Sequence, residues 1–328
     1  MKDGARVSKW SNQRGSSAYT FLGYAIIIVV AIAAIALYKS GDIGKGPSPD
    51  MVAAAKAMHN KDWKQAISMY DKVLKANPTS YEALLGRSKA FVQLGNLDKA
   101  FADADAAVKA KPSSAAAFGQ RGIVAKLQQK NDQARQDFTQ ALKLDPGFVW
   151  AYAQRADLSM KQNENEKALA DVNKALQANP KFVEALRLRA WVLNRMGQCA
   201  KASEDFGKVE KLSPGDPWSV QDTAWFLLTC PDEKVQNTAK ALELANKAKD
   251  LPGGKDGLIY ETLAEAYFKQ GDPAKSVEVQ KKAIEMGSKK CPDGSCTKEM
   301  KERLQKYELA ARQEVRTNYE ILPLDSGK

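Results

Sequence analysis

The chain has 328 residues, of which 44% are hydrophobic, and its 50 Lys and Arg against 39 Asp and Glu give a formal net charge of +11. Hydrophobic residues are abundant enough to form a buried core. Only one histidine, His59, is present, so a Ser/His/Asp or Cys/His catalytic arrangement would have to use it, and a zinc site is not expected.

The basic residues are spread along the whole chain and alternate with acidic ones. This pattern is typical of a solvated basic surface, although nucleic acid, an anionic membrane surface and acidic partners remain open as counterparts. Nucleic acid is the least favoured partner.

The first fifty residues predict a membrane anchor. Residues 19–38 contain no charged side chain, and twenty helical residues at about 1.5 Å each span roughly 30 Å, the thickness of a hydrocarbon core. We therefore predict a basic N-terminal segment over residues 1–18, a transmembrane helix over 19–38 and a flexible linker over 39–49. Cleavage as a secretory signal stays open, because Ala34-Ile35-Ala36 resembles a cleavage site.

Basic residues flank the predicted span on both sides, with a slight excess before it: Lys2, Arg6, Lys9 and Arg14, then Lys39, Lys45 and Lys56. Because positive residues tend to remain in the cytoplasm, this excess favours a cytoplasmic N-terminus. The remainder of the chain is then expected on the extracytoplasmic side.

Prolines recur every 34 residues, at Pro78, Pro112, Pro146, Pro180 and Pro214. With each proline as position 32, repeats begin at residues 47, 81, 115, 149 and 183. A 34-residue period is that of a helix–turn–helix array, in which each hairpin buries its apolar face against its neighbours. The period therefore favours a binding scaffold over an enzyme.

Small residues recur at positions 8 and 20, where they let two antiparallel helices approach closely. The members of these rows are Ala54, Ser88, Gly122, Ala156 and Ala190, and Ala66, Ala100, Ala134, Ala168 and Ala202. Position 24 carries the residue that fills the space to the next hairpin: Tyr70, Ala104, Phe138, Val172 and Phe206.

The period, the small residues and the closing proline resemble the tetratricopeptide repeat family over residues 47–290. The resemblance implies an all-α, right-handed solenoid of about seven repeats over residues 50–290, preceded by the transmembrane helix. The pattern departs from the family where the glycine that ends the first helix, as in Gly95, Gly197 and Gly271, is replaced by Gln129 and Asn163.

The last two repeats are less regular. The sixth begins near Pro217 and carries an insertion near Pro231–Thr238, and the seventh includes Ala264 and Gly271. We expect a cysteine loop and a polar capping helix over residues 291–317 and a frayed tail over 318–328.

Two charged rows run through the repeats: Arg87, Arg121, Arg155 and Arg189 at position 7, and Asp103, Asp137, Asp171 and Asp205 at position 23. The two positions face each other across a hairpin. We interpret the rows as an internal ion-pair ladder, with a row of arginines that binds a polyanion as the alternative.

The first helix of each tetratricopeptide hairpin is expected to line a concave groove. Tryptophan and arginine dominate binding hot spots, so we predict a peptide site. Its candidate residues are Trp150, Arg187, Trp191, Asn194, Arg195 and Trp225. The alternative, that these tryptophans pack between hairpins, stays open.

The clamp with which co-chaperone members of the family hold a C-terminal carboxylate is not matched. Leu85 and Lys89, Gln120, and Trp150 and Gln154 occupy its positions. We therefore do not expect heat-shock chaperone tails as ligands.

Four cysteines follow the regular repeats. Cys291 and Cys296 flank a turn-rich loop suited to a small disulfide, and Cys199 and Cys230 lie at helix ends that share one edge of a solenoid. Two disulfides predict an oxidising compartment, and four reduced thiols are the alternative. No phosphate-binding loop or catalytic motif appears, so we expect no enzymatic activity, no cofactor and no metal site.

These features predict a single-pass protein of a bacterial inner membrane. Its repeat domain is expected in the periplasm, where it acts as a scaffold or adaptor for segments of unidentified protein partners. A cytoplasm-facing receptor or chaperone-like factor for nascent or precursor chains is the alternative.

Overall fold

The computed structural model describes residues 48–291, 293–295 and 297–320, which form fifteen α-helices and no strand. The predicted transmembrane helix over 19–38 lies outside this part of the chain. No helix within it combines the length and apolarity that crossing a membrane requires.

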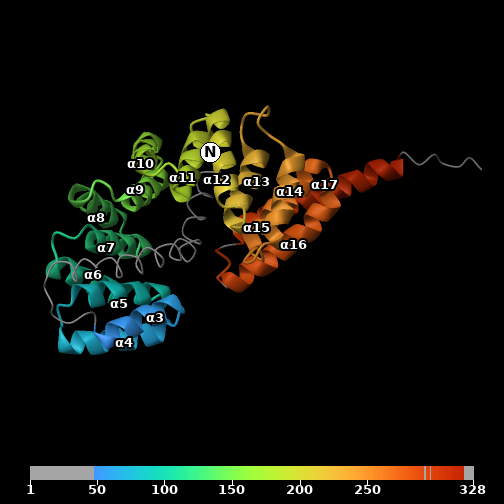
Figure 1. Cartoon of the computed structure of the whole chain (residues 1–328). Coiled ribbons are helices and arrows are strands. Elements are labelled where there is room, and N and C mark those ends of the chain that lie inside the picture. The colour runs from blue at the N-terminus through green and yellow to red at the C-terminus, as the bar shows by residue number, and fades with distance from the viewer. Residues whose placement is uncertain (1–47, 292, 296, 321–328) are drawn as a thin grey trace, which may run out of the picture. The chain divides into compact units, whose positions relative to one another are not determined.

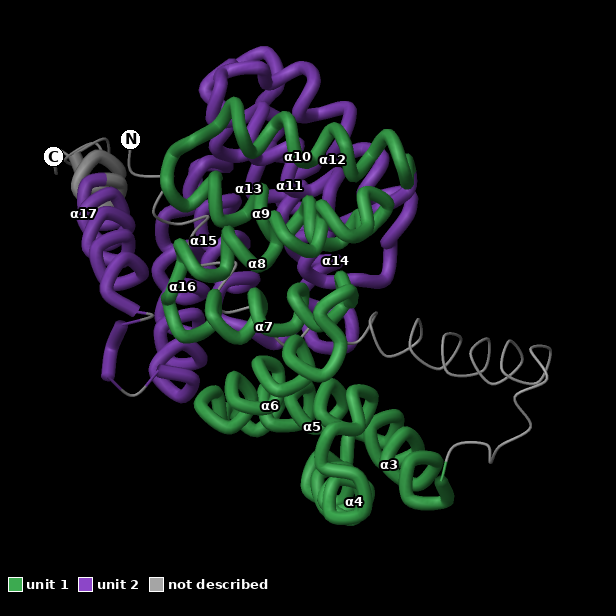
Figure 2. The backbone as a smooth tube through the Cα atoms, turned by 90° about the vertical axis from the view of Figure 1, so that its left-hand side faces the viewer, with its two compact units in different colours: residues 1–180 green, residues 181–328 purple. Residues whose placement is uncertain are grey.

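The chain divides into two compact units at residues 180 and 181 (Figure 2). The described part of unit 1 holds four helical hairpins, in which each first helix packs on its second (Figure 1). Their helices are α3 (Pro49–His59), α4 (Trp63–Ala76), α5 (Tyr81–Gln93), α6 (Leu97–Ala110), α7 (Ala115–Leu127), α8 (Asn131–Leu144), α9 (Val149–Lys161) and α10 (Asn165–Ala178).

Unit 2 continues with three hairpins and a terminal helix that packs on α16. Its helices are α11 (Val183–Arg195), α12 (Cys199–Leu212), α13 (Pro217–Thr229), α14 (Thr238–Asp250), α15 (Gly257–Gln270), α16 (Pro273–Lys290) and α17 (Lys298–Glu320). The seven hairpins of the described chain agree with the predicted number of repeats. The capping helix α17 ends three residues beyond its predicted end at residue 317.

The prolines end the second helices as predicted. Second helix α4 stops at Ala76 and α8 at Leu144, each two residues before the proline of its repeat. A proline has no N–H to continue the helical hydrogen bonds, and it disfavours helical dihedrals in the residue before it.

Close approach of the paired helices depends on the small residues. The five alanines at position 20 are fully buried. At position 8, a Cβ on Gly122 would come within 2.8 Å of a ring carbon of Phe138, so this ring fills the space that a larger residue at position 8 would need. In this hairpin the small residue therefore makes room for the large one, as close packing requires.

The turn between the two helices has the same conformation with or without glycine. Position 15 adopts positive φ in Lys61 (59°), Gln129 (62°) and Asn163 (62°), as it does in Gly95 (72°) and Gly197 (74°). The departure from the family pattern at Gln129 and Asn163 thus leaves the turn unchanged. These side chains carry the cost of a left-handed backbone, about 1 kcal/mol each.

Candidate functional site

The four arginines at position 7 each bind the aspartate at position 23 of the same hairpin through two nitrogens. In the second hairpin, Nε and Nη2 of Arg87 donate to the carboxylate oxygens of Asp103 at 2.8 and 2.7 Å. The same bidentate contact joins Arg155 to Asp171, with both distances 2.7 Å, and it recurs at Arg121 and Arg189. The predicted ladder is therefore present.

In unit 1 the third guanidinium nitrogen, Nη1, of each of these arginines donates a hydrogen bond to the preceding hairpin. Nη1 of Arg87 donates to Asp71 at 2.6 Å and Nη1 of Arg121 donates to Asp105 at 2.6 Å. Nη1 of Arg155 donates to the hydroxyl of Thr139 at 3.0 Å. All three acceptors occupy position 25, so each arginine joins two consecutive hairpins.

The aspartates at position 23 are buried, and both burial and ion pairing shift the pKa values of the ladder. The hydrogen bonds to Asp103 raise the pKa of Arg87, while burial raises the pKa of Asp137. Because the guanidinium donors of Arg87 and Arg121 are bound on both sides, these arginines are poorly suited to bind an external polyanion. The geometry favours the structural interpretation over the anion-binding one.

The first helices of unit 1 share a second set of charged side chains. We call the side of α5, α7 and α9 that carries Lys89, Lys126, Asp157 and Lys161 the lysine face. Nζ of Lys126 lies 2.5 Å and Nζ of Lys161 lies 3.1 Å from the same oxygen, Oδ2 of Asp157. Lys126 also donates to Oε1 of Gln154 at 2.8 Å, and this contact joins α7 to α9.

Two ammonium groups around one carboxylate control its ionisation. Burial raises the pKa of Asp157, but Lys126 and Lys161 more than offset this effect, so the pKa lies below its ordinary value. Burial also lowers the pKa of Lys161. The cluster therefore carries a net positive charge in a partly enclosed position.

Of the predicted site residues, only Trp150 belongs to unit 1. Its ring packs at 5.9 Å from the ring of Phe138 and at 5.8 Å from that of Phe148, and the residue remains half-buried. Trp150 thus contributes to packing between hairpins and also keeps part of its surface open.

Arg187 and Trp191 meet at a carboxylate in unit 2 that the sequence analysis did not single out. Asp222 of α13 is fully buried and accepts from Nε and Nη2 of Arg187 at 2.8 and 2.5 Å. The indole of Trp191 forms a further hydrogen bond to it. Burial raises the pKa of Asp222 to about 6, against the opposing effect of these two partners.

Trp191 itself is buried, with its ring edge-on to Phe206 at 5.2 Å. Asn194 places its Oδ1 3.7 Å from Sγ of Cys199, and burial lowers the pKa of Arg195. Four of the predicted residues, from Arg187 to Arg195, therefore lie on α11, and two of them converge on Asp222.

Trp225 is covered by the terminal helix. The guanidinium of Arg303 on α17 lies 4.9 Å from the Trp225 ring centroid and 3.3 Å from Oε1 of Glu261. One turn further along α17, the buried Tyr307 donates its hydroxyl to Glu265 at 2.6 Å. The capping helix therefore contributes specific contacts to α13 and α15, and its role exceeds that of a polar cover.

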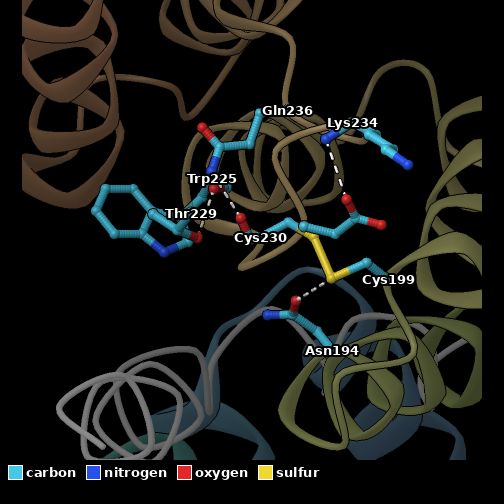
Figure 3. The surroundings of a disulfide bond; sticks show 8 residues. Asn194, Cys199, Trp225, Thr229, Cys230, Lys234 and Gln236 are labelled. Atoms are coloured by element: carbon cyan, nitrogen blue, oxygen red, sulfur yellow. Dashed lines mark hydrogen bonds between the residues drawn. A yellow bond between two sulfur atoms is a disulfide. The ribbon is translucent and has the colours of Figure 1, made fainter.

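A disulfide joins Cys199 at the start of α12 to Cys230 at the end of α13, with a Cα–Cα distance of 6.4 Å (Figure 3). The loop after Cys230 is fixed beside it, because the Gln236 amide donates to the Cys230 carbonyl at 2.7 Å (Figure 3). Cys291 is disulfide-bonded as well, and Cys296 lies outside the described residues. The described residues contain no group of three or more His, Cys, Asp or Glu side chains that could hold a metal ion.

Three models of the tetratricopeptide repeat match the chain, at residues 56–115, 125–192 and 258–287. The chain therefore contains tetratricopeptide repeats, as the 34-residue spacing predicted. No curated protein matches the chain in a sequence search.

Solved structures share the fold at low identity. A tetratricopeptide repeat protein from Parabacteroides merdae is 17% identical, with a TM-score of 0.60 and coverage of 79% of this chain and 97% of its own. The APC/C hetero-tetramer Cut9-Hcn1 is 12% identical, with a TM-score of 0.67 and coverage of 85% and 52%. Pseudomonas aeruginosa PilF is 18% identical, with a TM-score of 0.53 and coverage of 65% and 92%.

Proposed function

We propose that the chain is a membrane-anchored scaffold whose repeats hold segments of partner proteins on the first helices of the hairpins. The lysine face is the observation that carries this proposal. There, charged side chains lie on the first helices without serving the Arg–Asp ladder, and Trp150 remains partly open beside Phe138 and Phe148. Partly enclosed cations and an open aromatic ring are the kind of groups that anchor a bound peptide.

The proposed location is the periplasmic side of a bacterial inner membrane. Residues 19–38 supply an apolar span of sufficient length. The disulfide between Cys199 and Cys230 supports an oxidising compartment, because cytoplasmic thiols are kept reduced. A cytoplasm-facing receptor for precursor chains would have to function with this bond open.

Site-specific photo-crosslinking tests the binding proposal. A photoreactive amino acid at Glu82 or Gln93, on α5, should capture discrete partners in intact cells. The matched positions Lys75 on α4 and Lys143 on α8, which are exposed on second helices, should not. Equal capture at all four positions would contradict binding on the first helices.

Topology is tested separately. Protease added to spheroplasts should degrade the repeat domain if it faces the periplasm, and should spare it until lysis if it faces the cytoplasm. Protection in intact spheroplasts would overturn the proposed location and favour the receptor alternative. Recovery of the whole chain in the soluble fraction would contradict the proposed membrane anchor over residues 19–38.

Alanine at Trp191 or Arg187 is a poor probe of partner binding. Either change removes a partner of the fully buried Asp222, so unit 2 is expected to lose stability. Reduced capture by such a variant would not distinguish a lost contact from a damaged fold.

A further inference from the structure

Lys89 occupies the place on α5 that Asp157 occupies on α9, two repeats later. Around Asp157 stand Lys126 from the preceding first helix, and Gln154 and Lys161 from the same helix. The 34-residue spacing places neutral residues, Met58, Gly86 and Gln93, at the three corresponding positions around Lys89.

Among the residues that the structure describes, Lys89 therefore has no counter-charge. In the part of the chain that the structure describes, it forms no hydrogen bond or ion pair, although it is half-buried. Burial alone lowers its pKa to about 8. The acidic residue of α5 is Glu82, seven residues or about 10 Å away from Lys89 along the helix.

A partly enclosed ammonium group without a partner costs stability, whereas a paired one costs less. The Lys126–Asp157–Lys161 cluster on the same face also has one more positive charge than negative. Both features are complementary to carboxylates. A peptide segment fits them better than a small anion, because Lys89 lies on the second hairpin and the cluster joins the third hairpin to the fourth.

We propose that the lysine face binds an extended peptide segment with two acidic side chains, one paired with Lys89 and the other with the Lys126–Asp157–Lys161 cluster. This inference rests on the proposed peptide-binding function and specifies its ligand. Packed helices lie about 8–10 Å apart, so the two positions are about 10–20 Å apart. At about 3.3 Å per extended residue, the acidic side chains are three to six residues apart.

A peptide selection tests the proposal. The purified full chain is used to select from a random dodecapeptide phage library, and the same selection is made with the variants Lys89→Met and Lys75→Met. Methionine keeps the length of the side chain, and the control Lys75 is exposed on α4. Unfolding curves of both variants establish that they fold as the parent does.

The parent and Lys75→Met should select peptides with two Asp or Glu three to six residues apart, and Lys89→Met should lose this preference. A selected peptide with one Glu changed to Gln should bind the parent about tenfold more weakly. At one of the two acidic positions the change should have no effect on binding to Lys89→Met, because that pair is already lost. At the other position, which pairs with the cluster, the loss should persist in Lys89→Met.

Three results would overturn the inference. Selected peptides without an acidic preference, or with one that Lys89→Met retains, would separate Lys89 from the ligand while leaving the scaffold function in place. Loss of binding to anionic phospholipid vesicles in Lys89→Met, with unchanged peptides, would assign the face to the membrane. Failure of the parent to select any peptide would count against the proposed function as well.

Discussion

Position 9 of the repeat is surrounded differently in the two units. In unit 1, Lys89 is half-buried and has no partner among the described residues, and Asp157 is shared by two lysines. In unit 2, the same position holds Trp191, bound to the buried Asp222, and Trp225, covered by Arg303 of α17. One repeat position thus carries charged side chains in two hairpins of unit 1 and tryptophans with partners from their own chain in unit 2.

The difference shows that residue type alone does not identify the binding face. The tryptophans, which look best suited to bind a ligand, have partners from their own chain. The lysines of the lysine face, which look like ordinary surface residues, include Lys89, which forms no ion pair with any described residue. Unit 2 carries the last hairpin of the described residues, and α17 covers part of its surface, as the capping element of a solenoid does.

The largest effect is expected for Arg187→Ala. This change leaves the Asp222 carboxylate buried without its main counter-charge, which should lower the free energy of unfolding of unit 2 by about 3–5 kcal/mol. Lys89→Met in unit 1 should leave stability unchanged or slightly higher, because no partner is lost. Urea unfolding followed by circular dichroism measures both.

A double variant, Arg187→Met with Asp222→Leu, is the control for Arg187→Ala. It removes both charges and should recover most of the lost stability, since apolar side chains of similar volume can replace a buried ion pair. If Arg187→Ala lowers the free energy of unfolding by less than about 1 kcal/mol, the Arg187–Asp222 pair behaves as an exposed one. The proposed difference between the two units would then be wrong.

Removal of the disulfide by Cys199→Ala and Cys230→Ala should cost unit 2 about 3–4 kcal/mol, the loop entropy expected for cysteines 31 residues apart. Unit 1 contains no cysteine, so the protease resistance of its fragments should not change. Thermal unfolding with and without reductant measures the effect. If reductant leaves the parent's unfolding temperature unchanged, the bond is not formed in solution.

The buried Asp222 also predicts a pH effect confined to unit 2. Its folded pKa of about 6 exceeds the ordinary value of 3.8, so between these pH values the folded state holds a proton that the unfolded state has lost. Stability relative to Asp222→Asn should therefore fall as the pH rises from 4 to 7, by about 3 kcal/mol in all.

Urea unfolding of the parent and of Asp222→Asn at pH 4, 5, 6 and 7 tests this dependence. Comparison with the variant cancels the contributions of other carboxylates. A difference between the two proteins that rises with pH would mean that Arg187 and Trp191 outweigh burial, and that Asp222 titrates below its ordinary value.

The repeating features of the fold were predictable from the sequence because one period determines them. The 34-residue spacing placed the helix ends, the buried alanines and the pairing of Arg87 with Asp103. The hydrogen bonds of Nη1 to the preceding hairpin were not predicted. Their acceptors, Asp71, Asp105 and Thr139, recur at position 25, so the same spacing would have identified them.

The partners of the tryptophans were not predictable in this way, because they do not repeat. Asp222 is a single carboxylate at position 6 of the sixth repeat, and Arg303 belongs to a helix outside the period. Only the folded chain brings these residues together. For the same reason, Lys89 stands out only once its neighbours are known to be neutral.

The smallest predicted effect concerns the turns of unit 1. Gln129 adopts φ of 62° at the position where other repeats carry glycine, and a side chain makes this conformation unfavourable by about 1 kcal/mol. Gln129→Gly should therefore stabilise unit 1 by up to about 1 kcal/mol, and Gly95→Ala should destabilise it by a similar amount. Nothing lies within 4 Å of a Cβ built on Gly95, so the backbone conformation alone decides the sign there. Urea unfolding of the two variants should give shifts of opposite sign, and shifts of the same sign would show that the side chain at position 15 makes contacts that outweigh the left-handed turn.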